Sequence, residues 1–212
     1  MVSFKDAFTF IFDDDRWFDK LIVPLLVSLI PVVGQFVMLG YILRTIANVH
    51  QNQINPLPTF DFGEDLSRGF RYTLINLVYS LPAFVLALLF ILPINIINSN
   101  NGAGNEFFGI MLMLLFVFLI FVYALVLFLI QPLSMANFAV KNTFASGFEF
   151  GNFFRRLRKN FTSWLLVYAG SILAGLIAPL GSIVFFIGVV ITTFYSQLLV
   201  AHLSGQAMAA TD

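Results

Sequence analysis

The chain has 212 residues, of which 59% are hydrophobic and only 10% are charged, and its mean hydropathy is +0.92. A soluble domain keeps about 25% of its residues charged, so this composition excludes an ordinary soluble domain and predicts a chain that faces lipid. The formal net charge is zero, which argues against a nucleic-acid partner. There is no cysteine, which excludes disulfides, thiol catalysis and cysteine-based metal sites.

An amphipathic stretch opens the chain, within residues 1–20. Its apolar residues recur at the spacing of one helix face: Phe4, Ala7, Phe8, Ile11 and Phe12. We expect this helix to lie in the membrane interface. Its aspartates and the lack of a small-residue cleavage site argue against a cleavable signal peptide. The run Asp13-Asp14-Asp15 is interpreted as solvated charge. A divalent-cation site is the alternative, but no glycine-containing calcium loop surrounds the run, so no metal site is predicted.

No charged residue occurs between Lys20 and Arg44, and two structures fit this segment. A single tilted span of ~20 residues is one, although Pro24, Pro31 and Gly34 interrupt it. The other is a short re-entrant hairpin, residues 21–48, that turns at residues 31–34. Ten residues of helix reach only ~15 Å, so each arm would cover about half of the hydrocarbon thickness. The turn must then pack against protein, because lipid cannot satisfy an open backbone.

A short motif occurs twice, each time before a polar segment and an apolar run. The first copy is Phe60-Asp61-Phe62-Gly63 and the second is Phe148-Glu149-Phe150-Gly151. The first copy ends a polar connection whose Asn and Pro residues predict a loop. The acids that follow, Asp61, Glu64 and Asp65, are predicted to be helix-start charges that form ion pairs.

Four further apolar segments are long enough to span a membrane: residues 72–98, 107–130, 161–179 and 182–203. An uncharged turn at residues 98–105 separates the first two. Small residues in the third segment suit close helix contact: Gly170, Ser171, Ala174 and Gly175. They are interpreted as internal packing residues, with a dimer interface as the alternative.

These patterns predict an all-α, polytopic membrane protein in which residues 1–212 form one membrane domain. It is composed of three units, each an interfacial amphipathic helix followed by a hydrophobic hairpin. The units are residues 1–50, with hairpin 21–48, residues 60–140, and residues 148–203. The first hairpin is short, and it is re-entrant in the second of its two interpretations.

The basic residues predict the orientation. If residues 21–43 cross the membrane once, three basic residues lie on one side and eight on the other. A hairpin instead places all 11 Lys and Arg residues on one side. Positive charges collect on the cytoplasmic side. We therefore favour the hairpin and place both termini and the three surface helices in the cytoplasm, on the inner membrane of the cell.

The sequence offers little for catalysis or ion transport. The apolar spans carry no acid or base except His202, near the end of the last span, whereas ion-coupled carriers leave ionisable residues on the pathway. A nucleophile needs a base within reach, and neither His202 nor His50, predicted to be a solvated loop residue, has a motif around it. We predict no enzymatic activity and no cofactor.

The strongest surface feature is a basic cluster at residues 155–159. Together with two arginines before the second apolar run, it is predicted to bind anionic lipid headgroups. These candidate residues are Arg155, Arg156, Arg158, Lys159, Arg68 and Arg71. Positive-inside topology explains the same cluster without any specific lipid, and it stays the alternative.

Several motifs in the first 80 residues resemble one family. They are Phe4-x-x-Ala7-Phe8, Asp15-x-Trp17-x-x-Lys20-Leu21, Gly40-Tyr41-x-x-Arg44, Leu57-Pro58, Phe60-Asp61, Gly69 and Tyr79-x-x-Pro82. They are similar to those of a prokaryotic family of integral membrane proteins catalogued only as a domain of unknown function, number four thousand and thirteen. That family usually has Trp where Phe60 stands. The resemblance implies a membrane protein and assigns no activity to any residue.

Two functions fit these observations. The first is a non-enzymatic membrane scaffold or accessory subunit that binds lipids and membrane-protein partners through its cytoplasmic surface helices. Its partners would be membrane lipids and a larger complex or further copies of itself. The second is a transporter or scramblase-like path for a lipid or small amphiphile between the hairpins.

Overall fold

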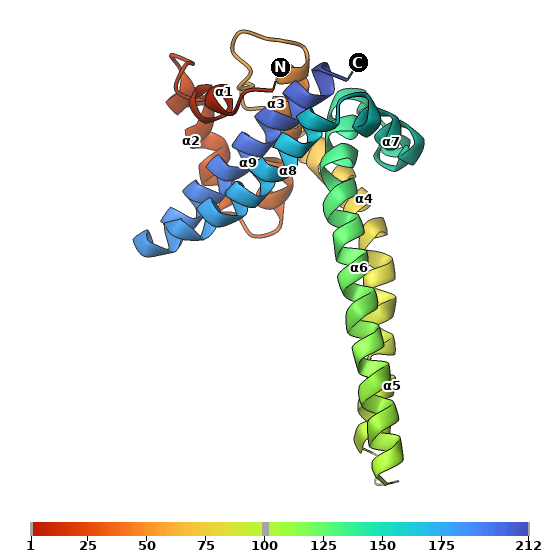
Figure 1. Cartoon of the computed structure of the whole chain (residues 1–212). Coiled ribbons are helices and arrows are strands. Elements are labelled where there is room, and N and C mark those ends of the chain that lie inside the picture. Colours follow the sequence, from red (N-terminus) through yellow and green to blue (C-terminus); the bar gives the residue numbers. More distant parts are fainter. Residues whose placement is uncertain (1, 99–101, 212) are drawn as a thin grey trace. The chain divides into compact units, whose positions relative to one another are not determined.

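The computed structural model describes residues 2–98 and 102–211, and in these ranges the chain is helical with no strand (Figure 1). The α-helices are α1 (Phe4–Thr9), α2 (Trp17–Ser28), α3 (Val33–His50), α4 (Phe62–Leu89), α5 (Ile91–Asn98), α6 (Ala103–Lys141), α7 (Phe150–Lys159), α8 (Phe161–Ile177) and α9 (Phe185–Ala209). Short 3₁₀ helices cover Phe144–Phe148 and Ala178–Val184. Part of the turn expected at residues 98–105, residues 99–101, lies outside the described ranges.

The chain divides into two compact units. The first combines Met1–Leu74 with Pro132–Asp212, and the second is Ile75–Gln131.

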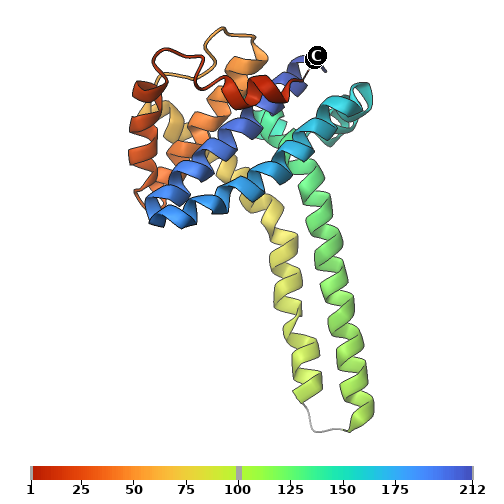
Figure 2. The ribbon, with the colours of Figure 1, turned by 60° about the vertical axis from the view of Figure 1, so that its left-hand side comes forward.

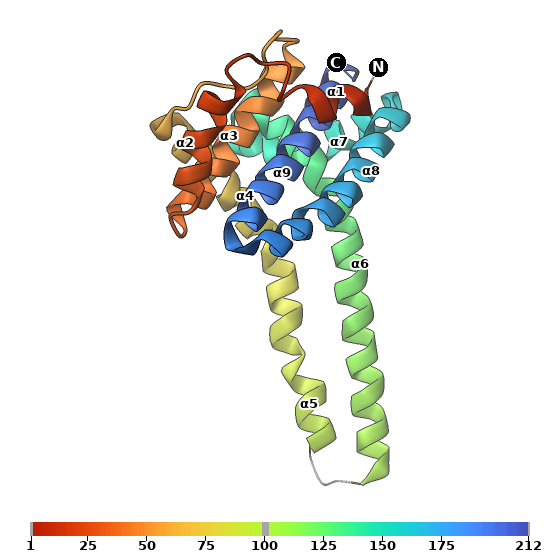
Figure 3. The ribbon, with the colours of Figure 1, turned by 90° about the vertical axis from the view of Figure 1, so that its left-hand side faces the viewer.

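Helix α9 is the centre of the first unit. It packs against α1, α2, α3 and α8, and Figure 2 shows α3 and α8 running along it. Its buried side chains include Phe194, Leu198, Leu199, Leu203 and Met208. Ser3 donates its backbone N–H to Gln206 Oε1 at 2.8 Å, so the first residues lie beside the end of the chain. In Figure 3 the turns after α2 and α8 lie at the end of this unit that is opposite to the start of α1 and the end of α9.

The uncharged segment 21–43 is two helices and not one. Helix α2 ends at Ser28, α3 begins at Val33, and the two pack on each other. Val32, at φ 67 and ψ −63, forms a γ-turn in which the Val33 N–H binds the Pro31 carbonyl at 2.8 Å. A single span would need one continuous helix here.

The second unit is formed by the later part of α4, by α5 and by the larger part of α6, which lie side by side (Figure 3). The chain changes from α4 to α5 at Phe90, three residues before Pro93. A proline supplies no backbone N–H and clashes with the carbonyl four residues earlier, here that of Leu89. The Tyr123 hydroxyl donates to the Tyr79 carbonyl and joins the two arms.

Three helical stretches in the described ranges are long and apolar enough to cross a membrane: Phe62–Asn98, Gly104–Lys141 and Phe161–Ile183. They contain the predicted spans 72–98, 107–130 and 161–179. The first begins earlier than predicted, because α4 includes the polar residues from Phe62 onward. The predicted span 182–203 falls on α9 and is not among the three.

Two glycines let the backbones of α3 and the start of α4 touch. A Cβ added to Gly40 would lie 1.8 Å from the Asp65 carbonyl oxygen, and one added to Gly69 would lie 1.7 Å from the Phe36 carbonyl oxygen. Both neighbours are backbone atoms that cannot rotate away. No side chain fits at either position while the two helices keep this distance.

Replacing Gly69 with Ala should therefore lower the free energy of unfolding by about 2 kcal/mol or more, because overpacking typically costs 1–3 kcal/mol. The loss would be measured by denaturant titration in mixed micelles. Gly63→Ala is the matched control, since its Cβ would meet only Asp61 Oδ1, at 3.6 Å. Equal stability of the two variants would contradict the close helix crossing.

Candidate functional site

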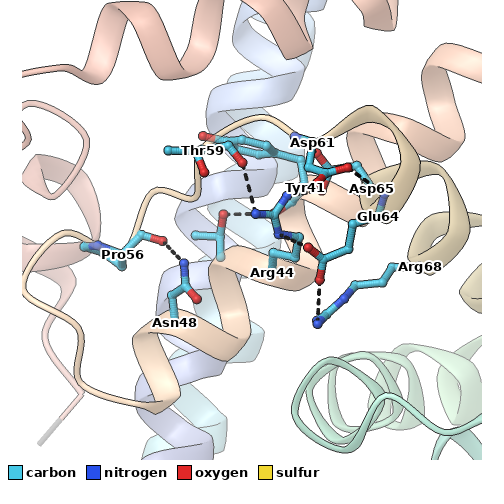
Figure 4. A network of polar contacts seen from close by, with 10 residues as sticks. Tyr41, Arg44, Asn48, Pro56, Thr59, Asp61, Glu64, Asp65 and Arg68 are labelled. Carbon is cyan, nitrogen blue, oxygen red and sulfur yellow. Dashed lines mark hydrogen bonds and ion pairs between the residues drawn. The ribbon is translucent and has the colours of Figure 1, made fainter.

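A buried ion pair lies where α3 crosses the start of α4. The Arg44 guanidinium donates to Asp65 Oδ1 at 3.0 Å and to the Thr59 carbonyl at 3.0 Å (Figure 4). Its Nε lies 3.5 Å from Glu64 Oε2. The Asp65 side chain has 0% exposed surface. A carboxylate buried to this extent requires a cation and further hydrogen bonds, and Arg44 supplies the cation.

The first turn of α4 supplies the other hydrogen bonds. The backbone N–H of Glu64 donates to Asp61 Oδ1 at 2.9 Å, so Asp61 caps the helix. The Asp61 N–H donates in turn to Asp65 Oδ2 at 3.2 Å. Glu64 forms an ion pair with Arg68 at 2.9 Å, one helical turn away. The predicted ion pairs are confirmed for Glu64 and Asp65, while Asp61 caps the helix; the sequence pattern missed Arg44 as a partner.

A second buried ion pair joins Asp14 to Lys20. Lys20 Nζ lies 2.6 Å from Asp14 Oδ2 and donates to the Leu57 carbonyl at 2.8 Å. Burial alone would raise the pKa of Asp14, but the hydrogen bonds from Lys20 and from the Arg16 N–H outweigh burial and lower it below its ordinary value. The interpretation of residues 13–15 as solvated charge is thus wrong for Asp14, which is only 3% exposed. Asp13 and Asp15 are exposed.

Both cations fix the same stretch of the connection between α3 and α4. Lys20 binds the carbonyl of Leu57 and Arg44 that of Thr59, while Asn48 Nδ2 binds the carbonyl of Pro56 at 3.0 Å. We call Asp14, Lys20, Arg44, Asp65 and these three carbonyls the polar cluster. Tyr41 is fully buried beside it, and its hydroxyl has no hydrogen-bond partner.

The polar cluster is a set of internal contacts. Each of its two carboxylates is bound to a cation, and a general base has to be available to a substrate. No group of three or more His, Cys, Asp or Glu side chains placed to hold a metal occurs in residues 2–98 and 102–211. His50 was predicted to be a solvated loop residue, but it is the last residue of α3 and is half-buried.

Glu149 organises the second copy of the repeated motif. Its carboxylate accepts hydrogen bonds from Lys141, from Asn137 and from Asn152. Together these donors lower the pKa of Glu149 from 4.5 to about 2. Asn137 also donates to the Ser146 carbonyl at 2.7 Å. The end of α6 is thereby tied to the residues that lead into α7.

The structure separates the six predicted lipid-binding residues into two groups. On α7, Arg155, Arg158 and Lys159 are exposed, whereas Arg156 is half-buried and donates to Thr211 Oγ1 at 3.3 Å. The arginines of α4 make internal contacts, Arg68 with Glu64 and Arg71 with the carbonyls of Ser67 and Asn142.

The predicted packing residues of α8 also differ in their surroundings. Gly170 and Ala174 are buried, and a Cβ on Gly170 would lie 2.2 Å from a methyl group of Leu203 on α9. Ser171 donates to the carbonyl of Val167 at 2.9 Å within its own helix. Gly175 has no atom within 4 Å of a Cβ.

The helical fold and its three long, apolar stretches are those of a membrane protein, and both polar centres consist of internal contacts. The chain belongs to the family described as "Protein of unknown function (DUF4013)", whose model matches residues 23–194. It is also 30% identical over 156 residues to "Uncharacterized protein MJ1189" of Methanocaldococcus jannaschii. This match covers 73% of the chain and 53% of the relative, so the chain spans about half of that protein's length. No solved structure matches the chain.

We expect Asp14→Asn to lower the free energy of unfolding by about 3 kcal/mol, because it leaves Lys20 buried without its counter-charge. Denaturant titration in mixed micelles would measure the loss. Asp13→Asn changes the neighbouring exposed residue in the same way and should alter stability little. If the two variants unfold alike, the Asp14–Lys20 pair does not stabilise the fold.

The Glu149 carboxylate should make stability depend on pH. Its folded-state pKa of about 2 lies below the ordinary value of 4.5. It therefore stabilises the fold above pH 4.5, and this contribution is lost as the pH falls from 4.5 to about 2. Glu149→Gln should flatten the curve of melting temperature against pH in this window, and Glu106→Gln, a change on the exposed start of α6, should not. An unchanged curve for Glu149→Gln would exclude this role.

Proposed function

We propose that this protein is a non-enzymatic scaffold or accessory subunit of the prokaryotic cytoplasmic membrane. In this proposal the surface helices lie on the cytoplasmic side together with both termini. They bind anionic lipid headgroups and membrane-protein partners, either a larger complex or further copies of the chain. Both carboxylates of the polar cluster are paired with a cation, which supports a structural role over a catalytic one.

The geometry of α7 is the observation that carries this proposal. Phe153 is 2% exposed and fixes the helix to the first unit. Arg155, Arg158 and Lys159 are exposed on the same helix, and so are Phe150 and Phe154. Exposed aromatic and basic side chains on one short helix suit the boundary between headgroups and acyl chains.

The position of α7 in the chain supports the same location. Helix α7 ends at Lys159, and the candidate membrane span Phe161–Ile183 begins two residues later. A basic segment next to a span attracts anionic headgroups at about 1 kcal/mol per residue. The positive-inside rule places such a segment on the cytoplasmic side.

The three-unit arrangement is part of the proposal. The turn between α2 and α3 supports the hairpin form of residues 21–48, since the charged residues Lys20 and Arg44 then face the same membrane surface. With this topology all 11 Lys and Arg residues lie on one side.

A scramblase-like path is the second candidate, and one feature bears on it. The second unit contains an open groove of about 330 Å³ lined by Ala87, Phe90, Val117 and Ile120. Such a groove suits an acyl chain, whereas moving a headgroup across the bilayer requires polar groups along the path. Flux of a fluorescent lipid across vesicles containing the protein would favour this candidate over the scaffold.

Replacing Arg155, Arg158 and Lys159 together with Gln should lower the preference for phosphatidylglycerol over phosphatidylcholine by at least about tenfold, since each contributes about 1 kcal/mol near an anionic surface. Spin-labelled lipids in reconstituted vesicles would report the relative association constants. Arg155→Lys with Arg158→Lys keeps the positive charges of the same helix and serves as the control. An unchanged preference in the triple variant would reject α7 as the lipid-binding element.

A further inference from the structure

Three exposed aromatic side chains lie against one another at the start of α2. The ring centroid of Trp17 lies 5.6 Å from that of Phe12 and 5.7 Å from that of Phe18, and both pairs have edge-to-face geometry. The side chains are 60%, 37% and 58% exposed for Phe12, Trp17 and Phe18. Large aromatic rings are enriched at the membrane–water boundary. We call these residues the aromatic triad.

The polar cluster holds the backbone of the triad in place. The Trp17 N–H donates to the Asp14 carbonyl at 2.9 Å, and the Arg16 N–H donates to Asp14 Oδ1 at 3.0 Å. Asp14 is itself bound by Lys20. The three rings therefore project from a turn that is fixed to the folded core.

An exposed apolar stripe continues from the triad to the turn between α2 and α3. Leu26, Leu29 and Ile30 are exposed and follow Phe18 at helical spacing, while Pro24 and Ser28 are buried on the opposite face. Val32, at the tip of the turn, is 65% exposed. The stripe and the tip carry no charge.

Four backbone donors of this turn are paired within it. The N–H groups of Leu29, Ile30, Val33 and Gly34 donate to the carbonyls of Leu26, Val27, Pro31 and Ile30. Pro31 has no N–H to satisfy. Irregular backbone at membrane depth is excluded mainly because its polar groups lack partners. At the four bonded donors and at Pro31 the turn lacks that obstacle.

The length of α2 limits how deep the turn can reach. Its 12 residues extend ~18 Å at 1.5 Å per residue, whereas half of a hydrocarbon core is ~15 Å. With the triad at the headgroups, the turn would lie near the middle of the bilayer. It would not reach the far surface.

We propose that the aromatic triad is a lipid-interface anchor that inserts the α2–α3 hairpin into one leaflet only. The triad binds the headgroup–acyl boundary, the stripe on α2 contacts the acyl chains, and the turn ends near the bilayer centre. This inference rests on the membrane location in the proposed function, but not on lipid binding by α7.

Trp17 is a built-in reporter of this depth. The chain has two tryptophans, and the other, Trp164, is buried with an indole nitrogen that has no hydrogen-bond partner. Trp164→Phe therefore leaves a single reporter without breaking a hydrogen bond. A second reporter, Leu29→Trp on a Trp17→Phe, Trp164→Phe background, marks the end of α2, where the backbone is helical. Leu26→Trp on the same background gives an independent position on the stripe.

Each full-length variant would be reconstituted into phosphatidylcholine vesicles brominated at either shallow or deep acyl carbons. We expect Trp17 to be quenched more by the shallow bromines and the reporter at position 29 more by the deep ones, with position 26 between them. No quenching at positions 26 and 29 would overturn the proposal, because the stripe would then face water or protein. Strongest quenching by shallow bromines at position 29 would also overturn it, since the hairpin would then lie flat in the interface.

The lipid is zwitterionic, so loss of the α7 preference for anionic lipid leaves this result unaffected. Iodide added to one face of the vesicles distinguishes a full crossing from insertion into one leaflet. If iodide reaches position 29 only from the face opposite Trp17, the hairpin crosses the bilayer and the proposal fails.

Discussion

The pairing of Asp65 with Arg44 constrains the whole first half of the chain. A carboxylate with 0% exposed surface costs several kcal/mol without a cation and hydrogen bonds in place. Arg44 lies 21 residues earlier, on another helix, so α3 and α4 have to cross closely at this point. Gly40 and Gly69 make the crossing possible because any side chain there would overlap backbone atoms. The Arg44–Asp65 pair thus depends on the two glycines, because it forms only when the helices approach this closely.

The α2–α3 pair has one charged end and one apolar end. Lys20 and Arg44 lie on the two arms of the α2–α3 pair, and both bind carbonyls of the following connection. Every residue between them is uncharged. The antiparallel arms therefore collect the charges at one end and leave an apolar turn at the other. A bundle divided in this way is suited to insertion from one membrane surface.

Sequence patterns predicted the features that depend on neighbours along the chain. The apolar runs predicted membrane-length helices, and the acids before the second run predicted ion pairs, of which Glu64–Arg68 is one. Patterns missed partners that only the folded chain brings together. Asp14 looked like one of three solvated aspartates, but Lys20 binds it and also donates to the Leu57 carbonyl, so that both groups are buried in the fold. The predicted span 182–203 stays a prediction: in the described residues it is not among the three membrane-length stretches, and much of α9 packs against α1, α2, α3 and α8. Hydropathy alone does not distinguish burial in protein from burial in lipid.

The two copies of the Phe-acid-Phe-Gly motif show what a repeat does and does not determine. Each copy precedes a helix, α4 in one case and α7 in the other. In the first copy the short Asp61 side chain caps its own helix, while the Asp61 backbone N–H donates to the buried Asp65 carboxylate. In the second the longer Glu149 side chain binds Lys141 and Asn137 on the preceding helix, and makes no side-chain cap bond to α7. The acid therefore accepts hydrogen bonds in both copies, but from its own helix in the first and chiefly from the preceding helix in the second. In the first copy the basic residues of the helix that follows are drawn into internal contacts, whereas in the second Arg155 and Arg158 point away from the core and are exposed. The first copy of the motif thus begins a helix that crosses α3 closely, and the second begins a helix with an exposed basic surface. Only the second is suited to bind a lipid headgroup.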